Sequence, residues 1–205
     1  SSIGEDTIIT CPECGYTANR QVATFKKEYF AEAEKPMEKV ETPHSKTIDE
    51  LCDFLKIEKT KTAKAVFMVG TFINDKNGEE EDKLIVAIVR GDMEVEESKL
   101  SNAIKANALR PAHDEEIREC GMVPGFASPI GAKGNFIAVI DDSVAKSNNL
   151  VAGANEEGYH YLNTNYGRDY TGLVADIASA RDGFLCPTCS HPLTVSKGVE
   201  VGNIF

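Results

Sequence analysis

The sequence predicts an α+β fold, a mixed sheet with flanking helices, together with a small unit built from the two ends of the chain. Three observations support this prediction. Strand-like apolar runs mix with amphipathic helical segments without a regular strand–helix–strand repeat. Two CxxC pairs, Cys11 with Cys14 and Cys186 with Cys189, lie near opposite ends. A polar, proline-containing stretch follows the first pair. We therefore expect three segments: residues 1–40, 41–180 and 181–205.

The overall charge limits the kinds of partner that this chain can bind. Its 205 residues include 22 Lys and Arg and 33 Asp and Glu, a net charge of −11. This balance argues against binding nucleic acid through a general positive field, so any such contact is local or supplied by another domain or chain. No apolar run approaches the ~20 residues of a membrane span, and the first residues lack the features of a signal peptide. We therefore expect no membrane contact and a cytoplasmic location.

The four paired cysteines allow two interpretations. Cys11, Cys14, Cys186 and Cys189 would form one structural zinc site if a whole domain is inserted between the halves of a zinc knuckle. Alternatively, the pairs are separate redox motifs. A redox CxxC is expected to begin a helix within a strand–helix unit, and neither pair has that setting. The zinc interpretation is therefore favoured, although the gap of roughly 170 residues is unusually long.

The first elements are a strand at residues 7–10 and a polar linker at 25–43.

The clearest helix begins at Thr47, which forms a capping box with Glu50. Its apolar positions recur with helical spacing, which usually means core packing but also suits the wall of a small pocket. These positions are Ile48, Leu51, Cys52 and Leu55.

A hairpin is expected next, with strands at 65–73 and 84–90. Asn77-Gly78 marks its turn, and residues 79–82 form an exposed acidic loop. The second strand is apolar without alternation, so both its faces should be covered. Helices are expected at 97–109 and 114–120.

Lys64 stands where the first apolar strand begins. It is either a solvated strand end, the usual place for a lysine, or a point charge that projects into a cleft to meet a phosphate or carboxylate.

A rigid loop rich in glycine and proline, residues 121–131, is either a plain connection between a helix and a strand or a cradle of backbone N–H groups for a ligand oxygen. Strands are expected at 136–140, 150–152 and 159–163, with Asp141 and His160 near strand ends. Arg168-Asp169 suggests a surface salt bridge or turn anchor. The chain should end with a short return at 173–180 and a strand at 197–202.

The order of several motifs resembles the editing insertion domain of bacterial-type prolyl-tRNA synthetases, which belongs to the YbaK-like deacylase superfamily. The resemblance covers nearly the whole chain. Its matching stretches are 15–19, 42–43, 46–51, 61–64, 89–92, 125–129, 140–141, 153–155 with Gly158 and His160, 168–169 and 198–205.

The resemblance implies a set of site residues. Lys64 matches an essential lysine, and Gly125 and Pro129 bound a GxxxP loop. Positions tied to activity correspond to Asp141 and His160. Residues that contact the substrate correspond to Ile48, Leu51 and Gly153.

The resemblance also implies a function, the hydrolysis in cis of alanine mischarged onto proline tRNA, beside the class II core of a homodimeric synthetase. The three class II motifs are absent, so ATP and Mg²⁺ would serve only the full-length synthetase. No Ser, Cys or metal nucleophile with a partnered base is visible, which favours direct attack by water. Two rival interpretations are a non-catalytic tRNA or protein docking module and a deacylase for another ester, such as cysteinyl-tRNA(Pro).

Overall fold

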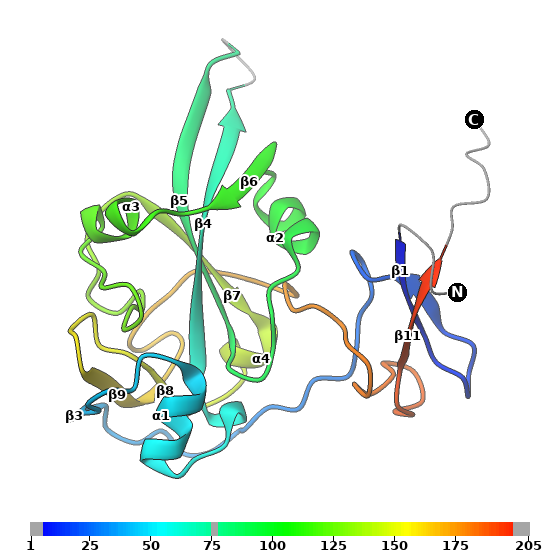
Figure 1. Cartoon of the computed structure of the whole chain (residues 1–205), viewed down its shortest axis with the longest axis horizontal. Helices are drawn as coiled ribbons and strands as arrows, with labels where there is room; N and C mark the ends of the chain where they lie inside the picture. Colours follow the sequence, from blue (N-terminus) through cyan, green and yellow to red (C-terminus); the bar gives the residue numbers. More distant parts are fainter. Residues whose placement is uncertain (1–5, 75–77, 199–205) are drawn as a thin grey trace. The chain divides into compact units, whose positions relative to one another are not determined.

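The computed structural model describes residues 6–74 and 78–198. The chain forms two compact units (Figure 1). One unit runs to Glu28 and resumes at Ala178, and the other spans Tyr29–Ile177. Among the described helices, none has the length and apolar character needed to cross a membrane.

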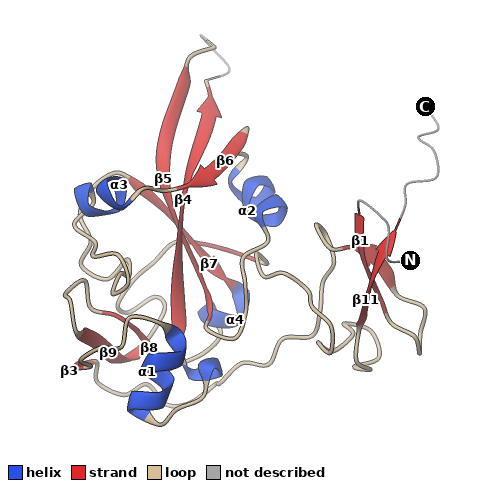
Figure 2. Cartoon of the chain, in the orientation of Figure 1, coloured by secondary structure: helices blue, strands red, loops and turns tan. Residues whose placement is uncertain are grey.

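The larger unit is built on a five-stranded mixed sheet, which confirms the predicted class. Its order is β10-β7-β5-β4-β6. The central strands β4 (Ala63–Ile73) and β5 (Glu80–Arg90) are antiparallel, and β6 (Ala108–Pro111) pairs antiparallel with β4. Strand β7 (Phe136–Asp141) runs parallel to β5, and β10 (Leu173–Ala175) runs parallel to β7. Figure 2 shows these strands crossing the unit between short helices.

Strand β5 forms the centre of the core. Every residue from Leu84 to Arg90 is buried, as the unbroken apolar run predicts. Val86 and Ile88 pack in one cluster with Ile140 of β7. The hydrophobic effect of this burial is the main stabilisation available to the unit.

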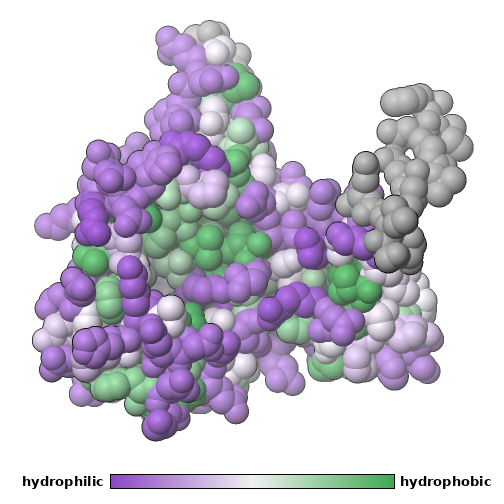
Figure 3. All heavy atoms as spheres, in the orientation of Figure 1, coloured by the Kyte–Doolittle hydropathy of each residue, from purple (hydrophilic) through white to green (hydrophobic). Residues whose placement is uncertain are grey.

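The prediction of an acidic loop at residues 79–82 is wrong in part, because Glu80–Asp82 belong to β5. Pairing between β4 and β5 continues as far as Ile73 opposite Glu80, beyond the last pair that β6 makes, Thr71 with Ala108. The result is a two-stranded arm with mostly hydrophilic side chains (Figure 3). The expected turn residue Asn77 lies outside the described residues.

A second, antiparallel sheet has the order β3-β9-β8. It contains β3 (Glu38–Glu41), β8 (Leu150–Gly153) and β9 (Tyr159–Thr164). The expectation that residues 25–43 form only a linker is therefore wrong at β3. This strand has one apolar residue, Val40, and it forms because its backbone pairs with β9.

The chain just before β3 is also ordered by specific contacts. We call residues 29–37 the strap. The side chain of Asn149 accepts a hydrogen bond from the Lys35 amide (2.9 Å) and donates one to the Ala33 carbonyl (2.9 Å). Asn163 donates to the carbonyl of Pro36 at 3.1 Å. Side chains from the start of β8 and the end of β9 thus fix the chain that enters β3.

The predicted helix at Thr47 is confirmed as α1 (Ile48–Leu55). The Thr47 hydroxyl accepts from the Glu50 amide at 3.2 Å, and the Glu50 carboxylate accepts from the Thr47 amide at 2.8 Å. A short 3₁₀ turn, η1 (Lys59–Lys61), follows.

The remaining helices are short. Helix α2 (Glu97–Ile104) ends earlier than the predicted residue 109 because Lys105 adopts a left-handed conformation with φ 57°. Helix α3 (Asp114–Glu119) begins as predicted, and an unpredicted turn, α4 (Asp142–Ala145), follows β7.

The smaller unit contains a three-stranded antiparallel sheet of order β11-β1-β2. Strand β1 (Asp6–Thr10) confirms the first predicted strand, and β2 (Thr17–Asn19) follows the first cysteine pair. Strand β11 (Thr194–Gly198) overlaps the start of the predicted last strand. The rest of that strand, and the end of the 198–205 motif, lie outside the described residues.

Candidate functional site

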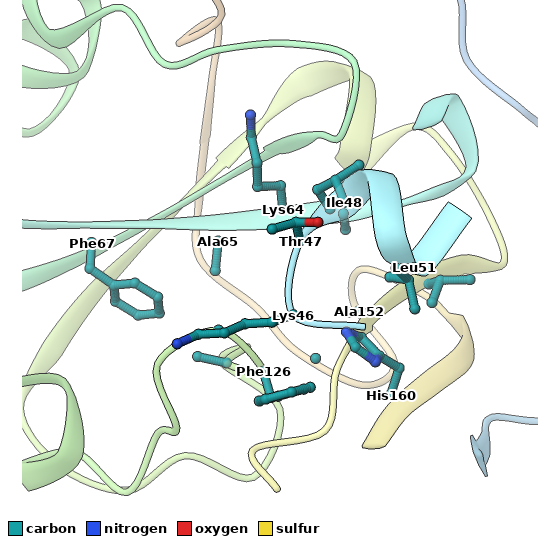
Figure 4. A pocket seen from close by; sticks show the side chains of 15 residues that line it. Lys46, Thr47, Ile48, Leu51, Lys64, Ala65, Phe67, Phe126, Ala152 and His160 are labelled. Carbon is teal, nitrogen blue, oxygen red and sulfur yellow. The ribbon is translucent and has the colours of Figure 1, made fainter. Parts of the chain in front are cut away.

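The larger unit contains a cavity of about 230 Å³. Its walls come from the start of α1, the first residues of β4, the Gly125–Ala127 loop, β8 and β9. Figure 4 shows the side chains that surround it. The lining residues are Lys46, Thr47, Ile48, Leu51, Ala63, Lys64, Ala65, Phe67, Gly125, Phe126, Ala127, Val151, Ala152, Gly153 and His160.

One wall of the cavity is apolar and comes from α1. Ile48 and Leu51 lie three residues apart on one face of the helix, and both line the cavity. Leu51 is only 2% exposed. The sequence left open whether this face of the helix packs in the core or forms a pocket wall. The structure shows both roles, because the face that packs against the core also lines the cavity.

A second wall is the backbone of the Gly125–Ala127 loop, which β8 approaches very closely. Gly125 has φ +87°, a conformation that favours glycine. A Cβ on Gly153 would lie 2.2 Å from the carbonyl oxygen of Phe126 and 2.7 Å from the amide nitrogen of Ala127. Only a glycine at position 153 permits this approach.

Asn155 holds the same loop in place. Its Oδ1 accepts from the Ser128 amide at 3.0 Å, and its Nδ2 donates to the carbonyls of Ser128 and Ile130, both at 2.9 Å. Its own amide donates to the Phe126 carbonyl at 2.9 Å. The sequence analysis did not assign Asn155 to the site. Its position between two strand segments was the available signal, since asparagine readily adopts the left-handed conformation found here, φ 54°.

The loop offers backbone donors to a ligand. Within the described part of the chain, no acceptor pairs with the amides of Gly125 or Ala127. Among the described residues, no serine, cysteine or carboxylate lines the cavity, and the one hydroxyl there, on Thr47, is bonded to Glu50 at 2.9 Å. The chemistry of the site therefore depends on amides, two lysines and one histidine.

His160 is neutral in this cavity. It is 5% exposed, and its burial lowers its pKa to about 4. Its Nδ1 lies 2.6 Å from the hydroxyl oxygen of Thr42, which itself donates to the Gly158 carbonyl at 3.3 Å. The Gly158 carbonyl also accepts from the Thr42 amide at 2.7 Å. The Thr42 hydroxyl hydrogen can therefore serve either that carbonyl or Nδ1, and the second ring nitrogen, Nε2, is a donor in one tautomer and an acceptor in the other.

Lys64 lines the cavity, yet its ammonium group is paired. The Nζ atom lies 2.8 Å from Oε1 of Glu94. The Lys64 side chain is 19% exposed and that of Glu94 is 61% exposed. Lys64 thus combines features of both sequence interpretations. Its side chain lines the cavity wall, and its charged end meets a carboxylate near the surface.

Comparison with known proteins identifies this arrangement. The family model described as "Aminoacyl-tRNA editing domain" matches residues 42–170. This chain belongs to that family. The resemblance stated from the sequence is therefore confirmed, and the matched range contains every residue that lines the cavity.

Curated relatives of this editing domain are proline–tRNA ligases. The chain is 45% identical over 204 residues to one from Dehalococcoides mccartyi, covering 98% of the chain and 34% of the relative. It is 43% identical to one from Salinispora tropica and 38% identical to one from Aquifex aeolicus, over 99% and 98% of the chain and 34% of each relative. The chain thus spans about a third of the length of these relatives.

A solved structure has the same fold as the editing domain. It is described as a putative trans-editing enzyme for prolyl tRNA synthetase and is 20% identical. The match covers 70% of this chain and 87% of that one, with a TM-score of 0.54.

Two of the predicted site residues of the editing domain lie outside the cavity, Pro129 and Asp141. Asp141 is fully buried. Its carboxylate accepts from the amides of Ser143 (3.0 Å) and Ile177 (3.1 Å) and from the Ser143 hydroxyl (2.6 Å). It joins the end of β7 to α4 and to the segment after β10, so its contacts are structural. Arg168 and Asp169 form the predicted ion pair at 2.8 Å.

The four predicted cysteine ligands lie together in the smaller unit. Their Sγ atoms all lie within 4.8 Å of one another. Cys11 and Cys189 are 3.4 Å apart, and Cys14 and Cys186 are 3.6 Å apart. Four thiolates around a tetrahedral zinc ion are about 3.8 Å apart, so this donor set fits zinc well.

Proposed function

We propose that this chain hydrolyses the ester of alanyl-tRNA(Pro), in cis, as the editing domain of a proline–tRNA ligase. One observation carries the proposal: a small cavity joins apolar walls, a loop with unpaired backbone amides and two lysines, and the described residues that line it include no serine, cysteine or carboxylate. An aminoacyl ester is already activated, so its hydrolysis needs a positioned water and stabilisation of negative charge more than it needs a covalent intermediate.

In the proposed reaction, water attacks the ester carbonyl carbon, and the carbonyl oxygen becomes negatively charged. The amides of Gly125 and Ala127 are the donors for that oxygen, a contact worth about 2.7–4 kcal/mol per donor in other hydrolases. The bond from this carbon to the ribose oxygen then breaks. One proton of the attacking water passes to the ribose oxygen, which becomes a hydroxyl group of the tRNA, and alanine leaves as the carboxylic acid.

His160 orients the water in this scheme and does not remove its proton. A general base works best with a pKa near the operating pH, and the pKa of His160 is about 4. In the tautomer that this scheme requires, the Nε2 atom is an acceptor and fixes the direction in which a water points. The ribose hydroxyl next to the ester is a second group that can orient the water.

Lys64 supplies positive charge to the substrate. Its partner Glu94 is mostly exposed, and exposed ion pairs contribute only about 0.2–1 kcal/mol. A phosphate or ester oxygen can therefore replace Glu94 at low cost. This exchange would bring the ammonium group into contact with the substrate.

Selectivity for alanine rests on exclusion. Apolar pockets discriminate by only about 1–3 kcal/mol per methylene through attraction. Proline carries additional ring methylenes, which would clash with the wall formed by Ile48 and Leu51.

In the whole ligase, we propose that the acceptor end of tRNA(Pro) delivers the ester from the class II catalytic core. ATP and Mg²⁺ would serve that core, and the full-length enzyme would be a homodimer. Zinc would be structural in the smaller unit.

The test is hydrolysis of alanyl-tRNA(Pro) by the intact chain and by Lys64→Ala, with prolyl-tRNA(Pro) and cysteinyl-tRNA(Pro) alongside. We expect alanine release to fall by at least 100-fold in Lys64→Ala, while the prolyl ester survives both proteins. Lys83→Ala is the matched control, because Lys83 also sits on a central strand and pairs with Glu81 at 2.9 Å, outside the cavity.

A second variant tests the substrate. Ile48→Ala should allow hydrolysis of the larger prolyl ester, and continued refusal would contradict the pocket assignment. Preferential release of cysteine by the intact chain would change the assigned substrate. If the intact chain releases nothing, adding the synthetase core in trans distinguishes a missing tRNA-binding surface from a docking module.

A further inference from the structure

The described residues that line the cavity include two lysines and no carboxylate. Lys64 is paired with Glu94, as described above. Lys46 is different: it is exposed, and its ammonium group has no ion-pair partner within residues 6–74 and 78–198. The chain has a net charge of −11, so this lysine beside the cavity is a local source of positive charge in a negative overall field.

The Lys46 side chain is held against the Gly125–Ala127 loop. A Cβ built on Gly125 would lie 2.7 Å from Cγ of Lys46 and 2.6 Å from Cε. The aliphatic stem therefore lies on the one residue of the loop that has no side chain to displace it. Figure 4 shows Lys46 passing Phe126, while Lys64 leaves the wall in another direction.

The nearby start of α1 is a less suitable anion site. The Glu50 carboxylate already accepts hydrogen bonds from the amides of Lys46 (3.1 Å) and Thr47 (2.8 Å). These contacts lower the pKa of Glu50, with the Thr47 amide as the main cause. The helix end is thus occupied by an acid of the chain itself, so an anion at this edge of the cavity would meet the Lys46 ammonium and not the helix amides.

We propose that Lys46 binds a phosphodiester of the single-stranded nucleotide end whose ester enters the cavity. The inference rests on the proposed function and adds a positioning residue to it. The substrate is a polyanion and the chain is strongly acidic, so binding needs a local cation at the cavity edge. A lysine suits this role, because its compact charge attracts a phosphate oxygen without demanding one geometry.

The experiment compares two ligands that differ in phosphate. Binding of the trinucleotide CCA, which has phosphodiesters, and of adenosine, which has none, is measured by NMR titration of the full chain at several salt concentrations. Lys46→Gln should weaken trinucleotide binding about fivefold and leave adenosine binding unchanged. The slope of log affinity against log salt should fall by about 0.7, the value for one phosphate on a single strand.

Two controls define the effect. Lys46→Arg keeps the charge and should retain most of the affinity. Lys56→Gln removes an exposed lysine at the other end of the same helix and should bind both ligands normally.

Equal weakening for adenosine and trinucleotide would mean that Lys46 only supports the loop, and it would overturn the proposal. So would an unchanged salt slope, or no trinucleotide binding by the intact chain. Because this readout is binding, it stands apart from the hydrolysis assay. If the expected binding pattern occurs and no alanine is released even after the synthetase core is added, the proposed reaction fails and the phosphate site remains.

Discussion

The unit that carries the four cysteines and the unit that carries the cavity differ in what stabilises them. The smaller unit has a sheet of three strands, three to five residues each, with few large buried side chains, such as Ile9 and Leu193. The larger unit surrounds β5 with apolar residues on both faces. Small domains rarely bury enough surface to fold without help. We therefore expect the stability of the smaller unit to depend on a few cysteine ligand atoms, and that of the larger unit on packing spread over many apolar side chains.

Removing a ligand from the cysteine cluster should have the largest effect. With Cys186→Ser, or with a strong chelator, we expect the smaller unit to unfold, because structural zinc contributes about 10–16 kcal/mol in comparable peptides. Slow hydrogen exchange at β5 should persist, and zinc content should fall below one ion per chain. Cys52→Ala, a buried thiol outside the cluster, should change neither measurement. Simultaneous loss of protection in both units would contradict the comparison.

Gly153→Ala should produce the next largest effect, confined to the larger unit. Its new Cβ would meet backbone atoms of Phe126, which cannot rotate away, so the loop must move. We expect unfolding to become easier by about 1–3 kcal/mol and hydrolysis to fall by at least 100-fold. The zinc content of the smaller unit should not change.

Gly158→Ala is the control for this substitution. It lies in the same hairpin and has φ +78°, but no atom lies within 4 Å of the position that its Cβ would occupy. It should lose stability through backbone strain and keep most of the activity. Equal loss of activity in the two variants would show that the close approach to Phe126 is not what matters.

The smallest predicted effect is a pH dependence that comes from His160. Its pKa is about 4 when folded and about 6.5 when unfolded, so the unfolded chain binds more protons between these values. Stability should therefore rise with pH in this range and drop by about 2 kcal/mol from pH 7 to pH 5. Urea unfolding at several pH values measures this. His160→Gln should remove that part of the slope, and a slope that persists in the variant would assign it to other groups.

Local signals predicted the elements that depend on neighbouring residues. The capping box of Thr47 and Glu50 located α1, and the apolar run at 84–90 located β5. The sequence could not show β3, because Glu38–Glu41 has one apolar residue and gains its structure from pairing with β9. Nor could it show the end of α2, which depends on the left-handed conformation of Lys105, a residue type with no strong preference for it.

The candidate site shows the same difference between what neighbouring residues reveal and what only distant contacts determine. The predicted residues that line the cavity, Ile48, Leu51, Lys64, Gly125, Gly153 and His160, come from five separate segments, and the family resemblance supplied their association. Asp141, also predicted as a site residue, lies outside the cavity and accepts hydrogen bonds from the amides of Ser143 and Ile177. The partners Glu94 and Asn155 were missed, since side-chain pairing across segments depends on register and loop path, which one sequence does not reveal.

The pairing of β3 with β9 has a consequence for how the protein is made. Thr42 and His160 lie 118 residues apart, yet a hydrogen bond joins them, and His160 lines the cavity. At about 5–20 residues per second, a ribosome needs roughly 6–24 seconds to extend the chain between them. During that time α1 and the β4–β5 hairpin can form from local contacts, while the strap and β3 have no partner. The cavity is therefore completed late in synthesis, well after the helix that forms its apolar wall.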